Sequence, residues 1–128
     1  MKIKSSQNLV SEALSSVKTI SPDEALNLLN KNECNLIDIR DLNELQKNGR
    51  IENSFHISRG LLEFSIHPES AYVQNQKMDL NKELVLFCAA GGRSALAAKT
   101  LNDMGFKNVS HIEGGFSAME QEGFKVKK

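Results

Sequence analysis

The sequence has no excess of charge of either sign, since 16 lysine and arginine residues balance 16 aspartate and glutamate residues. A balanced chain offers no electrostatic attraction to nucleic acid or to an anionic membrane surface. It also lacks an apolar run near the ~20 residues that a membrane-spanning helix needs. No apolar stretch follows the first lysines, so no signal peptide is visible. We therefore expect neither nucleic acid nor a membrane as a partner.

Cysteine is also scarce. The two cysteines, Cys34 and Cys88, are too few for a disulfide framework, so we expect a reducing, cytoplasmic location. The three histidines, His56, His67 and His111, do not have metal-ligand spacing, and no metal site is predicted. A chain of 128 residues most simply forms one domain.

Short apolar runs of strand length alternate with helical segments. The runs cover residues 17–20, 35–39, 55–57, 84–87 and 109–112. Alternating strands and helices indicate crossover connections, so we predict an α/β domain with a mostly parallel five-stranded sheet and helices on both faces. Ligands of such sheets bind beyond the carboxyl ends of the strands.

Helix boundaries are marked clearly. Residues 21–24 and 41–44 each have the composition of a helix N-terminus with a capping box. Two helices are expected to end at Gly105 and Gly123, each followed by a phenylalanine that packs back on its own helix. The stretch 65–82 has little periodicity, so it is either a lid or specificity loop or a plain surface connection.

The most informative segment is an apolar run that ends at Cys88 and opens a glycine-containing loop before a helix. Glycines let backbone N–H groups point inward, and a helix N-terminus adds unpaired donors and partial positive charge. A thiol at the focus of such a loop should ionise more readily than free cysteine. Arg93 places a positive charge at the positive end of the helix dipole, which is unfavourable. An anion bound between Arg93 and the loop would compensate for this cost. Cys88 is thus the predicted nucleophile, and the predicted anion-binding residues are Ala89, Ala90, Gly91, Gly92, Arg93 and Ser94.

Loop length selects the chemistry. The pattern is similar to that of protein tyrosine phosphatases, but it has one residue fewer between Cys88 and Arg93, and Phe87 stands where phosphatases usually have histidine. A narrower ring of N–H groups suits one extra sulfur on the cysteine better than a phosphate. Cys34 has neither a glycine loop nor a basic neighbour, and we predict a structural role for it.

Beyond the loop, three further motifs occur at residues 36–44, 49–60 and 112–116. In this order and spacing, over roughly residues 19–126, the chain resembles a single-domain rhodanese. We expect a helical N-terminal extension over residues 1–16 and a rhodanese-like domain over 17–128. The resemblance implies a persulfide on Cys88, stabilisation of that persulfide by the loop amides, and donor binding by Arg93. Asp38, Arg40 and Glu44 resemble the family's structural ion-pair cluster, while Asp38 and Arg59 are candidates for lining the pocket.

The resemblance implies a sulfurtransferase without a cofactor. It would move sulfane sulfur from a donor such as thiosulfate to cyanide or to a thiol, including a protein thiol. Because Ala89 and Ala90 are neutral where several thiosulfate-using relatives carry basic residues, thiosulfate is expected to be a poor or surrogate donor. The alternatives are a sulfur carrier or binding module without turnover, and a small cysteine-dependent phosphatase or arsenate reductase.

Overall fold

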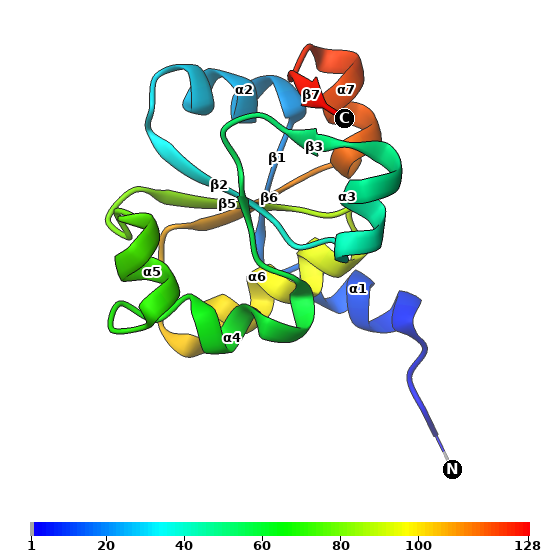
Figure 1. The fold of residues 1–128 in the computed structure, drawn as a ribbon. Coiled ribbons are helices and arrows are strands. Elements are labelled where there is room, and N and C mark those ends of the chain that lie inside the picture. The colour runs from blue at the N-terminus through cyan, green and yellow to red at the C-terminus, as the bar shows by residue number, and fades with distance from the viewer. Residues whose placement is uncertain (1) are drawn as a thin grey trace.

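The computed structural model describes residues 2–128 and has a central sheet of five parallel strands in the order β1-β6-β5-β2-β4 (Figure 1). The strands are β1 (Lys18–Ile20), β2 (Cys34–Asp38), β4 (Phe55–His56), β5 (Glu83–Phe87) and β6 (Val109–Ile112). All five lie within one residue of the strands expected from the sequence. A separate antiparallel pair joins β3 (Arg50–Ile51) to β7 (Val126–Lys127).

Helices cover both faces of the sheet. They are α1 (Ser6–Leu14), α2 (Pro22–Asn30), α3 (Leu42–Asn48), the 3-10 turn η1 (Arg59–Leu61), α4 (Leu62–Ser65), α5 (Ala71–Gln76), α6 (Gly92–Met104) and α7 (Gly115–Glu122). Helices α2 and α7 lie on one face, α4, α5 and α6 lie on the other, and α1 packs against α6 (Figure 1). In the described part of the chain, no helix has the length and apolarity that crossing a bilayer requires.

The core has two layers because side chains alternate along each strand. In β5, Leu84 and Leu86 pack with Leu101 of α6, whereas Val85 points to the other face and packs with Met119 of α7. All five side chains are fully buried. Each buried side chain of this size stabilises the fold by about 1.5–3 kcal/mol. The two layers hold the carboxyl end of β5 rigidly between the helices.

The helix N-termini follow the capping pattern of the sequence. The hydroxyl of Ser21 accepts a hydrogen bond from the amide of Glu24 at 3.1 Å. At the start of α3, the carboxylate of Glu44 accepts a hydrogen bond from the amide of Asp41 at 3.0 Å. Such caps satisfy amides that would otherwise have no partner at the helix start.

The ends of α6 and α7 share one geometry. Gly105 and Gly123 have φ values of +112° and +107°. The amide of Phe106 donates to the carbonyl of Leu101 at 3.1 Å, and the corresponding bond after α7 is 3.2 Å long. Each phenylalanine packs in the same core cluster as its own helix, so the predicted ends are confirmed.

The stretch 65–82 contains a helix, α5, that the lack of periodicity did not predict. Buried Val73 anchors this helix in the core. Beyond it, the carbonyl of Asp79 accepts a hydrogen bond from the side chain of Asn35 at 2.8 Å, near the start of β2. The segment therefore ends at the amino edge of the sheet, opposite to Cys88. These contacts support a surface connection rather than a lid over the cysteine.

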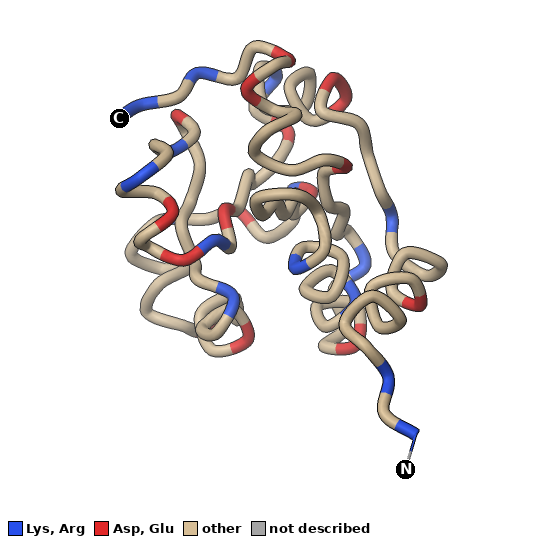
Figure 2. Tube along the Cα trace, turned by 90° about the vertical axis from the view of Figure 1, so that its right-hand side faces the viewer, with Lys and Arg blue, Asp and Glu red and all other residues tan. Residues whose placement is uncertain are grey.

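Charged positions of both signs are interspersed over the helices and loops (Figure 2). Some form exposed ion pairs, such as Lys4 with Glu12 at 2.8 Å and Lys18 with Glu83 at 3.3 Å. Pairs of this kind contribute about 0–1 kcal/mol each, because water screens them. The stability of the domain therefore depends on its core rather than on these surface pairs.

Candidate active site

Cys88 lies directly after β5, at the carboxyl edge of the sheet, and the loop behind it leads into α6 at Gly92. Its Sγ accepts hydrogen bonds from the amide of Gly91 at 3.1 Å and from the amide of Ser94 at 3.4 Å. Gly91 has a φ of +113°, which glycine adopts without strain. Cys88 is only 1% exposed. The loop thus places two amide donors on a sulfur that is shielded from bulk water.

The start of α7 closes the loop from behind. The amide of Phe116 donates a hydrogen bond to the carbonyl of Cys88 at 2.8 Å. Gly115 has a φ of +58°, and a Cβ at this position would lie 2.7 Å from the carbonyl group of Ala89. Only glycine permits this approach, so Gly115 brings the start of α7 against the backbone of the cysteine loop.

Helix α1 forms a wall of the site. A cavity of about 320 Å³ lies beside the loop. Its lining residues are Ser6, Val10, Cys88, Ala89, Ala90, Gly92, Arg93 and Leu96. A Cβ at Gly92 would lie 3.7 Å from Cγ2 of Val10, so α1 sits directly on the loop. The segment that the sequence sets apart as an extension therefore contributes to the cavity.

Arg93 makes a two-pronged ion pair with Glu44 of α3. Its Nη1 and Nη2 atoms lie 2.7 and 2.9 Å from the two carboxylate oxygens. The hydrogen bonds from Arg93 lower the pKa of Glu44 to about 2, and the carboxylate in turn raises the pKa of Arg93. Glu44 therefore lies close enough to the Asp38–Arg40 pair to be affected by the charge of Arg40, but its side-chain ion pair is with Arg93. It neutralises the only cation of the cysteine loop.

Asp38 and Arg40 form a separate pair inside the fold, and both side chains are at most 1% exposed. The Arg40 guanidinium donates to both oxygens of Asp38, with bonds of 3.0 and 2.8 Å, and to the carbonyl of Gly49 at 3.0 Å. It also stacks on Phe116, 4.0 Å from the ring centre. The interpretation of Asp38 as a pocket-lining residue was wrong, because Arg40 occupies its carboxylate in the interior. The structural interpretation of this pair agrees with these contacts.

Arg59 does not line the cavity beside Cys88 either. Its guanidinium donates to Glu63 at 2.8 Å and to the hydroxyl of Thr100 at 3.2 Å. These contacts tie η1 to α4 and α6. The prediction that Arg59 lines the pocket was wrong because local partners hold its side chain.

The structure places two side chains behind the predicted residue Ser94 that the sequence did not assign to the site, His111 and Thr19. The hydroxyl of Ser94 lies 3.6 Å from Sγ of Cys88 and 2.9 Å from Nδ1 of His111. Nε2 of His111 lies 2.9 Å from the hydroxyl of Thr19 on β1. His111 is 2% exposed, and burial lowers the pKa of its imidazole. No spacing signal could reveal this row, since three different elements supply it.

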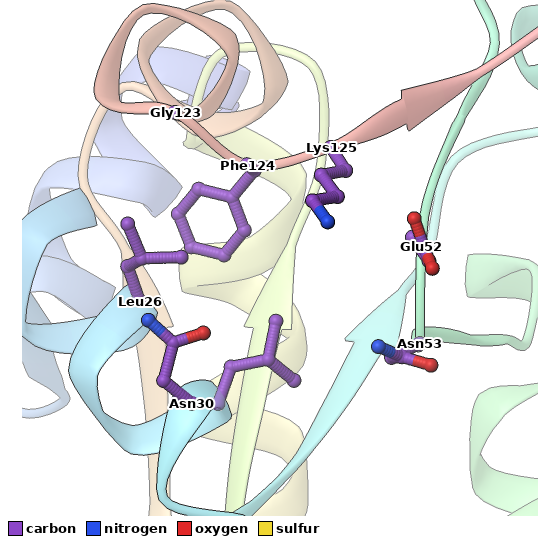
Figure 3. A pocket seen from close by; sticks show the side chains of 8 residues that line it. Leu26, Asn30, Glu52, Asn53, Gly123, Phe124 and Lys125 are labelled. Carbon is purple, nitrogen blue, oxygen red and sulfur yellow. The ribbon is translucent and has the colours of Figure 1, made fainter.

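Another cavity, of about 400 Å³, lies at the far end of α2 and α7 (Figure 3). Leu26, Phe124 and Lys125 are among its lining residues, and Glu52 faces it from the other side. No cysteine or histidine lines it, so it has no nucleophile of the kind found at Cys88. Among residues 2–128, no three His, Cys, Asp or Glu side chains are grouped to hold a metal ion.

Comparison with known proteins places these features in a family. The model of the rhodanese-like domain matches residues 21–122. The thiosulfate sulfurtransferase GlpE of Shewanella oneidensis is 30% identical over 108 residues, which are 84% of this chain and 97% of that protein.

Solved structures agree with this match. A protein of unknown function from Rhodopseudomonas palustris, described as a possible tyrosine phosphatase, is 40% identical, with a TM-score of 0.85 and coverage of 99% of this chain and 97% of that chain. The polysulfide-sulfur transferase homodimer of Wolinella succinogenes is 35% identical, with a TM-score of 0.73 and coverage of 93% and 84%. On this evidence, the chain belongs to the rhodanese-like domain family, among relatives that include sulfurtransferases.

Proposed function

We propose that the protein is a sulfurtransferase that carries a sulfane sulfur as a persulfide on Cys88. The observation that supports this most directly is the pair of amide donors on Sγ, at 3.1 and 3.4 Å, beside an open cavity. Preorganised amides stabilise a sulfur anion without moving during the reaction. The names of relatives such as GlpE support the same reaction class.

The transfer has two steps. In the first, the Cys88 thiolate attacks the outer sulfur of the donor, the S–S bond of the donor breaks, and its electron pair leaves with sulfite or with a thiolate. The product is a persulfide anion on Cys88. In the second, an acceptor thiolate or cyanide attacks the outer sulfur of this persulfide and regenerates the Cys88 thiolate. Splitting the reaction in this way is the usual advantage of covalent catalysis.

The charge around the loop bears on the donor. Arg93 is paired with Glu44, and Ala89 and Ala90 add no charge to the cavity wall. A dianion such as thiosulfate therefore meets a site with little net positive charge. An organic persulfide, which carries at most one negative charge, fits the apolar wall of Val10 and Leu96 better. A thiol, either small or on a protein, is the proposed physiological acceptor.

A location in the cytoplasm is part of the proposal. Both cysteines are free thiols, and the reaction requires Cys88 in this state. A reducing compartment maintains free thiols, whereas an oxidising one converts them to disulfides.

A second candidate is phosphate-ester hydrolysis, because the relative from Rhodopseudomonas palustris is described as a possible tyrosine phosphatase. In the present chain the cysteine loop is one residue shorter than the phosphatase pattern, and the arginine that would grip a phosphate is held by Glu44. These two observations favour sulfur over phosphate. Release of p-nitrophenol from p-nitrophenyl phosphate tests this alternative directly.

Intact mass spectrometry tests the proposal. The reduced protein is incubated with thiosulfate, 3-mercaptopyruvate or polysulfide, alongside Cys88→Ser and Cys34→Ser. We expect a gain of one sulfur atom in the wild type and in Cys34→Ser, and no gain in Cys88→Ser. Loading without subsequent release to cyanide or thiols would indicate a sulfur carrier. The absence of loading with every donor would contradict the proposal.

A further inference from the structure

A row of hydrogen-bonding groups leads from Cys88 into the fold and out again at another surface. It runs from Sγ of Cys88 to the hydroxyl of Ser94, 3.6 Å away, then to His111 and finally to Thr19, each at 2.9 Å. The outer end is open, because Thr19 is exposed. Thr19 and His111 also line a cavity of about 240 Å³.

This second cavity is distinct from the one beside Cys88. The cavity at Thr19 is lined by Gly91 and Glu113 but not by Cys88, whereas the cavity beside Cys88 is lined by Arg93 but not by His111. Val10, Ala90 and Gly92 line both. The cysteine loop, together with α1, therefore separates a side from which a donor reaches Sγ from a side at which the hydrogen-bonded row meets solvent.

We infer that Ser94 and His111 form a proton relay that takes up the thiol proton of Cys88, with Thr19 stabilising the imidazolium that results. This inference rests on the proposed function, in which Cys88 is the nucleophile. In the step, the S–H proton moves to the hydroxyl oxygen of Ser94 while the proton of that hydroxyl moves to Nδ1 of His111. A neutral thiol and a neutral imidazole thereby become a thiolate and an imidazolium. The Thr19 hydroxyl, 2.9 Å from Nε2, accepts a hydrogen bond from this imidazolium.

The surroundings of His111 fit this role. Burial keeps the imidazole neutral in the resting state, so Nδ1 is free to accept a proton. The relay uses the tautomer in which Nε2 donates to the Thr19 hydroxyl and the lone pair on Nδ1 faces Ser94. The neighbouring charged group on the chain is Glu113, which favours the imidazolium once it forms.

Among residues 2–128, Glu113 is the charged group that acts on His111, and the elements packed beside it present apolar or hydroxyl side chains. Strand β1 presents Thr19, and α1 presents Val10 and Leu14 to the outer cavity. On the side of Cys88 the charged groups are Arg93 and Glu44, which neutralise each other. Ser94 contacts the reacting sulfur, whereas His111 acts through Ser94 and is a positioning residue.

Alkylation of Cys88 by iodoacetamide as a function of pH tests the relay without any sulfur donor. All variants are made in a Cys34→Ala background, so that Cys88 is the only thiol. Ser94→Ala and His111→Asn should raise the pH midpoint of alkylation by about one, which lowers the rate near neutral pH about tenfold, and should leave the plateau at high pH unchanged. Thr19→Val should shift the midpoint in the same direction by a smaller amount.

Ser110→Ala is the matched control. Ser110 is buried next to His111 on β6, and its hydroxyl has no hydrogen-bond partner among the described residues. Its removal should leave the midpoint unchanged. If His111→Asn does not fold, as judged by circular dichroism, Ser94→Ala and the exposed Thr19→Val carry the test.

Three outcomes would overturn the relay: equal midpoints in the wild type and the variants, a rate reduced equally at every pH, or a shift in Ser94→Ala alone. The first shows that the thiol ionises without help, the second shows a purely structural effect, and the third removes His111 from the path. The sulfur-loading experiment is read separately. The expected alkylation profile without sulfur loading would support the relay and contradict the proposed function.

Discussion

The two cysteines of this chain lie on neighbouring parallel strands and are both buried, but they sit at opposite ends of the sheet. Cys34 begins β2 opposite Glu83, while Cys88 follows the last residue of β5. Burial and the Glu83 carboxylate raise the pKa of Cys34 to about 11. Cys88 instead accepts hydrogen bonds from two amides at the start of α6. Both thiols are shielded from water, and they differ in the groups that face the sulfur atom.

The sharpest test of this comparison exchanges each sulfur for oxygen. Cys88→Ser should lower sulfur transfer by about a thousandfold or more, since no other group can carry the persulfide. Cys34→Ser should leave turnover within about twofold, because Cys34 lies at the opposite end of the sheet from the loop. Cyanide-dependent thiocyanate formation measures both variants with the donor that loads the wild type best. An equal loss of sulfur transfer in the two variants would contradict the assignment of Cys88 alone as the sulfur-carrying cysteine.

The second test concerns the backbone around Cys88. Gly115→Ala should destabilise the fold by about 2–4 kcal/mol, because the new methyl group meets the Ala89 backbone and φ is +58°. Gly60→Ala is the matched control, since its Cβ would meet nothing within 4 Å. Urea unfolding measures both. A change below about 0.5 kcal/mol in Gly115→Ala would show that the loop and α7 are not tightly coupled.

The third test removes the ion pair that Arg93 makes beside Cys88. Glu44→Gln leaves Arg93 without its counter-charge, and we expect kcat/KM with thiosulfate to rise about three- to tenfold. A singly charged organic persulfide serves as the control donor, and its kcat/KM should change less than that of thiosulfate. An unchanged rate with thiosulfate would show that the pair does not restrict dianionic donors.

The same pair has a pH signature. In the folded state Arg93 stabilises the ionised form of Glu44 and lowers its pKa from 4.5 to about 2. The contribution of the pair to stability is therefore present above pH 4.5 and is lost as the pH falls toward 2. The free energy of unfolding of the wild type should therefore fall more steeply in this range than that of Glu44→Gln. Parallel curves would indicate that solvent screens the pair completely.

The smallest effect belongs to Cys34. Its pKa is raised from 9.0 to about 11, so the folded state prefers the neutral thiol, and this preference costs stability as the pH rises from 9 toward 11. Cys34→Ala should flatten the loss of unfolding free energy in that range, with little change at pH 7 beyond the loss of packing. Urea titrations at pH 7, 9 and 10.5 compare the two proteins. Identical slopes would mean that Cys34 does not titrate with folding.

Much of this architecture was predictable because its signals are local. The strands, the caps at Ser21 and Asp41, and the turns at Gly105 and Gly123 depend on residues a few positions apart. The loop after β5 was also predictable, since the strand, the glycines and the helix start are contiguous. The lack of periodicity in 65–82 hid α5, whose six residues are held by the buried Val73 rather than by a repeating pattern.

The partners of the site were not predictable in the same way. Arg93 meets Glu44, which lies 49 positions away, and Ser94 meets His111, 17 positions away. Asp38 and Arg59 lie in the expected motifs, yet neighbouring side chains hold them away from the cavity. A motif specifies residue types and order, but many partners can satisfy a charged or hydroxyl side chain.

The sequence by itself determined that this chain folds as parallel crossover units and that Cys88 stands where a strand meets a helix N-terminus. Only the tertiary structure decided that Glu44 neutralises Arg93, that α1 covers one side of the loop, and that His111 and Thr19 stand behind Ser94. The physical reason is the range of the interactions. Backbone hydrogen bonding and apolar periodicity act between near neighbours in the chain, whereas the environment of Cys88 is assembled by packing elements that are far apart in it.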